Sequence, residues 1–350
     1  MKEIKQREWS ELAQIWKELI DGNPIATPFQ SYDYLTFTGK GKPLRNDWFR
    51  TVGLRELNLV LYVDHTPIAI APMLYKRRNG KATVYFRGHF TVANHLDLIY
   101  ASLSYDDFAY LMDGIRSLLG DVAFFLDRVY CKSPTSEYLK TYLSAATIQE
   151  HECFAIPVPK TYDDWYQSLT KSRREKIRQC NNRIANDNAQ CSVSYFAGEK
   201  INAAIYREMV SVYADRFLVK NNYIFRSFNH LAKNALRSFL LKDKMTQWLN
   251  NANNSFHVVV YINHEVAAFS SGLISKDKRI LGCRFAMYTK YKRYNPGVIL
   301  ISSTIGYLAE QKAAGQLDIA QLDMGQGGDG GMTYKSTYGG EVYSNYTFIE

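Results

Sequence analysis

Residues 62–69 read Tyr-Val-Asp-His-Thr-Pro-Ile-Ala, and residues 261–268 read Tyr-Ile-Asn-His-Glu-Val-Ala-Ala. The two stretches align without gaps at an offset of 199 residues. Each places a short polar turn between two apolar runs, a pattern that predicts a β-hairpin. The predicted hairpin strands are 57–63 and 68–75 in the first half, and 256–262 and 266–274 in the second. A hairpin repeated in this way predicts a duplicated domain.

The order of the elements after each hairpin supports the duplication. Both halves continue with more β-strand, then a helix, then a glycine, and then a strand that ends in aspartate. In the first half these are 82–87, 96–100, 105–119, Gly120 and 122–126, before Asp127. In the second half they are 279–288, 297–313, Gly315 and 317–323, ending at Asp323, with the last strands in 341–348. The alternation predicts an α/β fold with a mixed sheet.

We expect an N-terminal domain over 1–155 and a C-terminal domain over 156–350, the latter with a helical insert at about 161–250. The N-terminal stretch reads as an amphipathic helix, placed over 7–20 by the spacing of its apolar residues. Further predicted helices are the basic segment 165–178, and 202–218 and 229–250 within the insert.

Composition narrows the class of protein. The 350 residues carry 43 Lys and Arg against 34 Asp and Glu, a formal charge of +9, which favours anionic partners such as phosphate-bearing cofactors. The basic residues are spread out, so we expect no DNA partner. The five cysteines include no Cys-x-x-Cys pair, and we expect no metal site. Reduced thiols, the lack of a signal peptide and the absence of a long apolar run predict a cytoplasmic protein without a transmembrane segment.

The segment Tyr291-Lys-Arg-Tyr-Asn-Pro-Gly-Val-Ile-Leu300 lies between a predicted strand and an apolar helix. Asn295 suits the N-cap position, and Pro296 suits the first helical position. Gly297 allows close approach of a ligand, and free amides at a helix start hold phosphates. Basic residues surround the segment: Lys290, Lys292 and Arg293. The same residues also suit a well-capped helix after a basic loop.

A glycine-rich segment follows the next predicted strand. Residues 325–331 contain five glycines between Asp323 and the pair Tyr334-Lys335. The segment matches neither a Walker A loop nor a Gly-x-Gly-x-x-Gly loop before a helix. It is either a loop that closely approaches a ligand or a solvated hairpin loop.

Taken in order, the hairpin, the strand, the Tyr-x-x-Tyr-Asn-Pro-Gly-x-x-Leu helix start, the Asp-x-x-x-Gly strand end and Tyr-Lys resemble the GNAT acyltransferases of the CelD type, known from cellulose biosynthesis. That group is related to the FemAB-like proteins, which have two GNAT folds in tandem. The early Phe29-Gln-Ser-Tyr32 also matches, and the specific part of the resemblance is 256–335. Many GNAT enzymes have a Gln/Arg-x-x-Gly-x-Gly/Ala loop where this chain has 293–298, which leaves the donor open.

The resemblance implies that acyl-CoA, expected as acetyl-CoA, binds where strands 280–288 and 317–323 separate. The residues that it implies for this cofactor are Phe285, Ala286, Met287, Tyr288, Tyr291, Arg293, Tyr294, Asn295, Pro296, Gly297 and Val298. The corresponding region of the first half, 88–105, lacks a Pro-Gly helix start. We therefore expect the N-terminal domain to be a degenerate GNAT-like domain that does not bind CoA.

The implied reaction is attack of an amine or hydroxyl on the thioester carbonyl, helped by a general base and by backbone amides. The expected catalytic residues are Glu265, Asp323, Tyr334 and Lys335. His257 and His264 remain alternatives for the base, and Tyr338 for the acid. Expected acceptor-binding residues are Arg87, His89, His95 and Arg284. Each of these groups also has a purely structural interpretation.

The resemblance thus predicts acyl transfer from acyl-CoA to a small molecule, a sugar or an envelope precursor, in exopolysaccharide or cell-envelope metabolism. One alternative is a FemAB-like transferase that takes its acyl group from aminoacyl-tRNA, for a peptidoglycan-type acceptor. Another is a catalytically inactive GNAT fold that only binds. The acceptor, the acyl chain length and the oligomeric state stay open.

Overall fold

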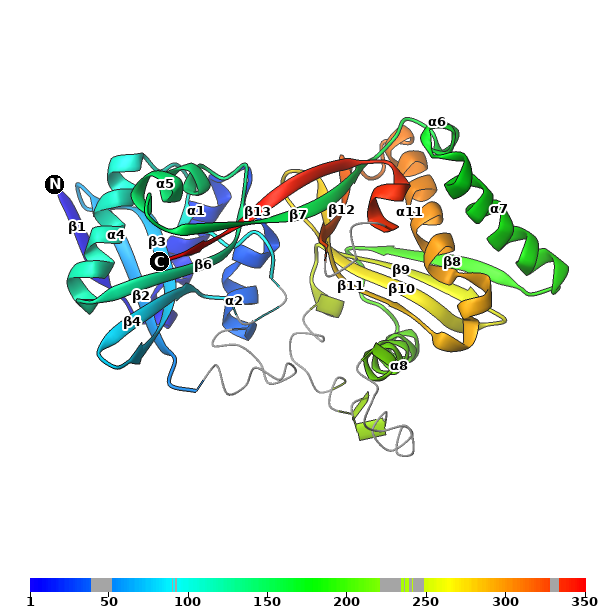
Figure 1. The fold of residues 1–350 in the computed structure, drawn as a ribbon, viewed down its shortest axis with the longest axis horizontal. Helices are drawn as coiled ribbons and strands as arrows, with labels where there is room; N and C mark the ends of the chain where they lie inside the picture. The colour runs from blue at the N-terminus through cyan, green and yellow to red at the C-terminus, as the bar shows by residue number, and fades with distance from the viewer. Residues whose placement is uncertain are drawn as a thin grey trace. The chain divides into compact units, whose positions relative to one another are not determined.

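The computed structural model describes residues 1–38, 52–89, 91, 93–220, 234, 235, 237, 238, 241, 249–327 and 334–350. They form two compact units. Unit 1 comprises Met1–Cys153 together with Val342–Glu350, and unit 2 comprises Phe154–Glu341 (Figure 1). Among the described residues, no helix has the length and apolar character needed to cross a bilayer.

Unit 1 contains a mixed sheet. Its elements are β1 (Lys2–Gln6), α1 (Ala13–Asp21), α2 (Tyr32–Thr38), β2 (Arg55–Val63), β3 (Thr66–Arg78), β4 (Lys81–Phe86), β5 (Ile99–Tyr100), α4 (Tyr105–Leu119), β6 (Val122–Tyr130), α5 (Pro134–Tyr142), the first part of β7 (Thr147–Pro157) and most of β13 (Glu341–Ile349). The strand order is β1-β2-β3-β4-β6-β13-β7, and β5 pairs with β3. β4 and β6 are parallel, whereas the pairs β1–β2, β2–β3, β3–β4 and β6–β13 are antiparallel.

Unit 2 repeats this arrangement. Its elements are the end of β7, α6 (Tyr162–Ser168), α7 (Lys171–Asn186), β8 (Cys191–Ala197), α8 (Ala203–Lys220), β9 (Ser255–Ile262), β10 (Glu265–Ile274), β11 (Arg279–Met287), the 3-10 helix η4 (Thr289–Tyr294), α11 (Pro296–Ala313), β12 (Gln321–Gln326) and the 3-10 helix η5 (Ser336–Tyr338). The strand order is β8-β9-β10-β11-β12-β7. β11 and β12 are parallel, whereas the pairs β8–β9, β9–β10 and β10–β11 are antiparallel.

The two units therefore share one topology. An antiparallel run of four strands (β1 to β4, or β8 to β11) leads through a helix (α4 or α11) to a parallel fifth strand (β6 or β12). The hairpin turns match in detail, because Asp64-His65 and Asn263-His264 all have left-handed backbones, with φ of 47° and 67° in the first pair and 51° and 67° in the second. Such two-residue turns suit the twist of the strands that they connect. The predicted duplication and the mixed α/β class are confirmed.

Helices cover both faces of the unit 2 sheet, and the side chains of β9 show which face is which. Val258 and Val260 belong to the apolar cluster that includes α6, α7 and α11, whereas Val259 belongs to the cluster with α8. Because successive strand residues point to opposite faces, α11 and α8 lie on opposite sides of this sheet (Figure 1).

Several predicted elements differ from the structure. Lys2–Gln6 forms the edge strand β1 and not the start of a helix, because it pairs with β2; α1 begins only at Ala13. The basic segment 165–178 is divided between α6 and α7, because the Thr170 side chain accepts from the Arg173 amide and starts a new helix.

The insert predicted at 161–250 is not purely helical, because it contains the strand β8. The helix predicted at 229–250 lies mostly outside the described residues. The domain limits at 155 and 156 stay predictions, and the structure additionally assigns Val342–Glu350 to unit 1.

Candidate functional site

The parallel strands β11 and β12 separate soon after they meet. They pair only over three residues, Arg279–Leu281 against Gln321–Asp323. β11 then continues to Met287 and β12 to Gln326 without pairing to each other. A Cβ atom on Gly282 would lie 3.1 Å from the Asp323 carbonyl oxygen, so a glycine fits this point of separation well. The sheet of unit 2 thus has a gap between its two parallel strands.

A cavity of about 240 Å³ occupies this gap. Both faces of the sheet contribute to it, since its lining includes residues of α11 and one residue of α8. The lining residues are Arg216, Phe256, Val258, Ser270, Ile280, Gly282, Cys283, Arg284, Phe285, Leu300, Ile301, Thr304, Leu322, Asp323, Met324, Tyr334 and Lys335. Apolar side chains dominate, with a few polar groups among them, which is typical of small-molecule sites.

Lys335 holds the separated end of β12. Its Nζ atom donates to the carbonyl oxygens of Met324, Gly325 and Gln326, at 2.7, 3.0 and 2.9 Å. The residue is buried. Because an ammonium group has three hydrogens, these bonds occupy its donors. The predicted catalytic residue Lys335 therefore lies in the cavity wall with its charge directed at the backbone.

Asp323 is also built into the wall. Its Oδ1 accepts from the Gly325 amide at 2.7 Å, and its Oδ2 lies 3.4 Å from Arg279 Nη1. Arg279 is anchored in turn by Asp277, whose Oδ2 accepts from Nε at 2.6 Å. The carboxylate of Asp323 is thus neutralised by a buried arginine at the point where the strands separate.

Tyr334 lines the same cavity but remains partly exposed. Burial raises the pKa of its phenol, while the nearby positive charge of Arg216 acts in the opposite direction. The phenol is therefore protonated at neutral pH and is able to donate a proton.

Glu265, the fourth predicted catalytic residue, does not line the cavity. It begins β10, and its Oε2 accepts from Lys290 Nζ at 2.7 Å and from the Tyr291 hydroxyl at 2.8 Å. The ammonium of Lys290 lowers the pKa of this carboxyl. Glu265 therefore connects the hairpin to η4.

The start of α11 is packed more closely than its sequence suggests. Asn295 occupies the N-cap position with a left-handed φ of 48°, and its side chain makes no cap hydrogen bond. Pro296 is the first helical residue, as predicted. A Cβ on Gly297 would lie 2.5 Å from Met287 Sδ and 2.9 Å from Phe285 Cζ. Side chains of β11 therefore leave room only for a glycine at this position.

The other residues predicted for the cofactor are distributed around this helix start. Phe285 lines the cavity, whereas Ala286 and Tyr288 pack on the α8 side. Tyr291 and Tyr294 share a small apolar cluster. Val298 donates its amide to the Asn295 carbonyl at 2.9 Å, and Arg293 forms an ion pair with Asp187 at 2.7 Å.

The three predicted acceptor residues of the first half have partners within unit 1. Arg87 donates to the Leu35 carbonyl at 3.1 Å and forms an ion pair with Glu56 at 3.1 Å, and its guanidinium lies 3.5 Å from the Trp9 ring centroid. Burial lowers the pKa of Arg87.

The two histidines of this group are likewise engaged. His89 Nδ1 lies 2.6 Å from Asp127 Oδ1, and His95 Nε2 lies 3.1 Å from the Tyr343 hydroxyl. These contacts favour structural roles for the two side chains. Of the predicted acceptor residues, Arg284 lines the cavity of unit 2.

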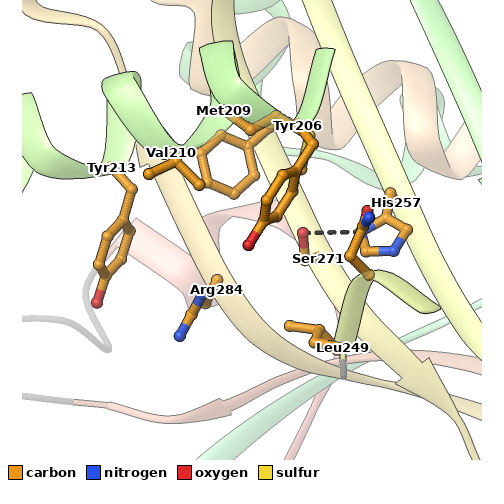
Figure 2. A pocket seen from close by; sticks show the side chains of 10 residues that line it. Tyr206, Met209, Val210, Tyr213, Leu249, His257, Ser271 and Arg284 are labelled. Atoms are coloured by element: carbon orange, nitrogen blue, oxygen red, sulfur yellow. Dashed lines mark hydrogen bonds between the residues drawn. The ribbon is translucent and has the colours of Figure 1, made fainter. Parts of the chain in front are cut away.

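A second, smaller cavity of about 20 Å³ lies between α8 and the sheet (Figure 2). His257 and Ser271 are opposite each other on β9 and β10, with Nδ1 and Oγ 2.9 Å apart. Burial lowers the pKa of His257 to about 4, so that the imidazole is neutral at pH 7. Figure 2 shows Tyr206, Tyr213 and Arg284 on the other side of this space.

Sequence patterns did not identify several of the lining residues. Arg216 follows Tyr206, Met209 and Tyr213 along α8 at a spacing of three to four residues. This helical spacing is the sequence feature that could have placed Arg216 on the same face of the helix. No such feature identifies Cys283. Burial raises the pKa of its thiol to about 12, which makes it a poor nucleophile. Among the described residues, no group of three or more His, Cys, Asp or Glu is arranged to hold a metal ion.

Comparison with known proteins supports this description of the fold. Residues 171–336 match the family model of the acetyltransferase (GNAT) domain. No curated protein matches the chain in sequence.

Solved structures resemble the chain along its whole length. A conserved protein of unknown function from Bacteroides thetaiotaomicron VPI-5482 is 12% identical, with a TM-score of 0.54 and coverage of 100% of this chain and 99% of that one. FemX is 11% identical, with a TM-score of 0.50 and coverage of 99% and 97%. A tandem GNAT protein from the clavulanic acid biosynthesis pathway is 10% identical, with a TM-score of 0.46 and coverage of 100% and 98%. With the repeated topology, these comparisons show a mixed α/β fold repeated in tandem, and residues 171–336 of the chain resemble an acetyltransferase (GNAT) domain.

Proposed function

We propose that unit 2 transfers an acyl group, expected as acetyl, from acyl-CoA to an amine or hydroxyl of an acceptor. The observation that carries this proposal is the gap between β11 and β12, which contains a cavity of about 240 Å³ and has α11 on one face and α8 on the other. A gap of this kind allows a narrow thioester arm to enter from one face and an acceptor to approach from the other.

The diphosphate of the donor would bind at the start of α11. The first amides of a helix lack intrahelical acceptors, and the helix dipole favours negative charge there. Met287 packs on Gly297, but this residue is 39% exposed and its side chain is unbranched. We therefore assign Met287 to a movable cover that swings away when the donor binds.

The reaction would be a direct transfer. The acceptor nitrogen or oxygen attacks the thioester carbonyl carbon, the carbon–sulfur bond breaks, and the departing thiolate takes a proton from Tyr334. The raised pKa of Tyr334 keeps that proton available at neutral pH. Cys283 is an unsuitable relay nucleophile, since its thiol stays protonated.

Asp323 and Lys335 are better suited to positioning than to proton transfer. The Asp323 carboxylate already accepts from Gly325 and faces Arg279, and the Lys335 ammonium is bonded to three carbonyls. Together they fix the edge of β12 beside the gap. The cytoplasmic location and a role in exopolysaccharide or envelope metabolism stay predictions from the resemblance.

Calorimetric titration of the full chain tests the donor. We expect acetyl-CoA to bind with a dissociation constant in the micromolar range, about −8 kcal/mol. Binding of aminoacyl-tRNA without acetyl-CoA would instead support the FemAB-like alternative. Binding of neither donor would leave the inactive binding module.

A matched pair of variants locates the binding. Cys283→Phe fills the gap, whereas Cys191→Phe places the same ring on β8, on an exposed residue outside the cavity. We expect only Cys283→Phe to abolish acetyl-CoA binding, with both variants retaining a cooperative thermal transition. Equal affinity in the two variants would contradict the proposed site.

A further inference from the structure

We propose that a cavity beside the first turns of α7 binds a phosphate group of a substrate, and that Arg173 and Lys176 contact its oxygens. The inference rests on the proposed function for the identity of that substrate. The phosphate belongs either to the ribose of the acyl-CoA donor or to a phosphorylated acceptor. Its binding can be measured separately from acyl transfer.

The cavity has a volume of about 300 Å³ and lies within unit 2. Its lining residues differ from those of the cavity in the gap. They come from the start of α7, between residues 170 and 179, and from Thr337 on η5. Every lining side chain carries a hydroxyl, an amide or a charge. Such a lining suits an ionic group better than an apolar one.

Arg173 is held in place with most of its hydrogen-bond donors available. Its Nη2 atom donates to the Thr337 hydroxyl, and its Cζ atom lies 4.3 Å from the ring centroid of Tyr338. The ring contact orients the guanidinium without using its hydrogens. Because a guanidinium has five N–H groups, others remain for the oxygens of a phosphate.

Lys176 supplies a second cation one helical turn later. It lines the cavity and is half-buried. Among the residues that the structure describes, no hydrogen bond or ion pair involves its ammonium group. The two cations share the lining with one carboxylate, that of Glu175, so an excess of positive charge remains. A concave site of this charge attracts an anion.

The cavity lies near the expected binding place of the donor's diphosphate. Ile177 and Cys180 of α7 pack in the same apolar cluster as Val298 of α11 (Figure 1). Burial raises the pKa of the Cys180 thiol, and the groups close enough to oppose that rise are Lys176, Arg183, Arg173 and the side chain of Asn295. Asn295 is the N-cap residue of α11. The positive face of α7 therefore borders the start of α11.

Two hydrogen bonds connect this cavity to the gap. Arg173 donates to the Thr337 hydroxyl, which in turn donates to the carbonyl oxygen of Tyr334. Tyr334 lines the cavity of about 240 Å³ and is the proposed proton donor. A substrate anchored by its phosphate at α7 would therefore lie close to the reacting groups.

Ligands that differ by one phosphate test the inference. CoA and dephospho-CoA are titrated calorimetrically into the full chain, as wild type and as Lys176→Gln, Glu175→Gln and Arg178→Gln. Arg178 is the matched control, an exposed cation of α7 outside the cavity lining. Lys176 is the more informative of the two cations, because replacing Arg173 also removes its contact with Thr337.

If the donor supplies the phosphate, the wild type should bind CoA about tenfold or more tightly than dephospho-CoA. Lys176→Gln should lose most of that preference, because it removes a charge beside the phosphate. Glu175→Gln should enlarge the preference, because it removes the opposing charge. Arg178→Gln should retain the preference of the wild type.

A second titration tests a phosphorylated acceptor. Phosphoethanolamine and ethanolamine are titrated into the same variants without a donor. Equal affinity for CoA and dephospho-CoA, together with binding of phosphoethanolamine that Lys176→Gln weakens, would support the phosphate site and assign it to the acceptor.

The inference is overturned if Lys176→Gln and Glu175→Gln leave the affinities for CoA and for phosphoethanolamine unchanged. Acetyl-CoA binding that Cys283→Phe abolishes would then still support the proposed function. Conversely, Lys176-dependent binding of phosphoethanolamine to a chain that binds no acetyl-CoA would support the phosphate site and refute the proposed donor.

Discussion

The ammonium nitrogen of Lys335 lies 2.7 Å from the carbonyl oxygen of Met324, where β12 no longer pairs with β11. A strand that leaves its neighbour has backbone carbonyls without strand partners. Lys335 supplies hydrogens to three of them. The gap in the sheet is therefore a stabilised feature.

Replacing Lys335 should destabilise unit 2. Lys335→Met keeps the side-chain length but leaves buried carbonyls without a donor, at a cost of about 1–3 kcal/mol of unfolding free energy. Denaturant unfolding measures the loss. The control Lys292→Met removes an exposed lysine and should change stability by less than about 0.5 kcal/mol. Equal effects of the two substitutions would mean that the three hydrogen bonds contribute nothing.

His257 should make stability depend on pH. Burial lowers its pKa to about 4 in the folded protein, against 6.5 for an ordinary histidine. The unfolded chain therefore binds the proton more tightly, and stability falls as pH drops from about 6.5 to 4. The upper limit of the loss is about 3 kcal/mol.

A comparison of variants isolates this effect. His257→Gln should flatten the fall in stability between pH 6.5 and 4, as followed by urea unfolding at several pH values. His264→Asn changes an exposed turn residue to one that tolerates its left-handed backbone, and should keep the wild-type pH profile. If His257→Gln lost stability with falling pH as steeply as the wild type, His257 would not be the group responsible.

Gly297 and Met287 should be energetically coupled. Gly297→Ala places a methyl group 2.5 Å from Met287 Sδ and should cost about 1–3 kcal/mol through overpacking. Met287→Ala in the same chain should recover part of that loss, as a double-mutant cycle would show. If Met287 covers the donor site, Met287→Ala alone should also raise the affinity for acetyl-CoA. Additive effects in the cycle would argue against the contact.

Tyr334→Phe tests the proposed proton donor. Removing the hydroxyl should lower kcat by about 10²-fold or more and change the KM for acetyl-CoA little. Steady-state kinetics with acetyl-CoA measure both constants. Tyr105→Phe, an exposed position in unit 1, serves as the control and should leave both constants unchanged. A change confined to KM would reassign Tyr334 to binding.

Local patterns in the sequence predicted most of the elements. The helix expected at 105–119 coincides with α4, because Ser104 caps its start and Gly120 adopts a φ of 74° at its end. The hairpins followed from apolar runs around short polar turns. β1 was not predicted as a strand, because Lys2–Gln6 is a charged edge strand in which no residue is buried.

Relations between distant residues could not be predicted in this way. The hydrogen bonds of Lys335 depend on the path of β12. Arg216 and Arg284 line the same cavity only because α8 lies close to β11 in the folded chain. Gly297 was selected for its place at a helix start, and its sequence neighbours do not reveal that Met287 packs on it. Glu265 lies outside the cavity for the same reason: its position depends on the hairpin's contact with η4.

Strand β13 has a consequence for biosynthesis. Its residues from Val342 onward belong to unit 1, and those from Asn345 to Ile349 pair with β6, yet the ribosome adds them only after it has made all of unit 2. During synthesis, β6 of the first unit therefore keeps an unpaired edge until β13 has been translated. A recombinant fragment that stops at residue 155 would keep that edge exposed and should self-associate.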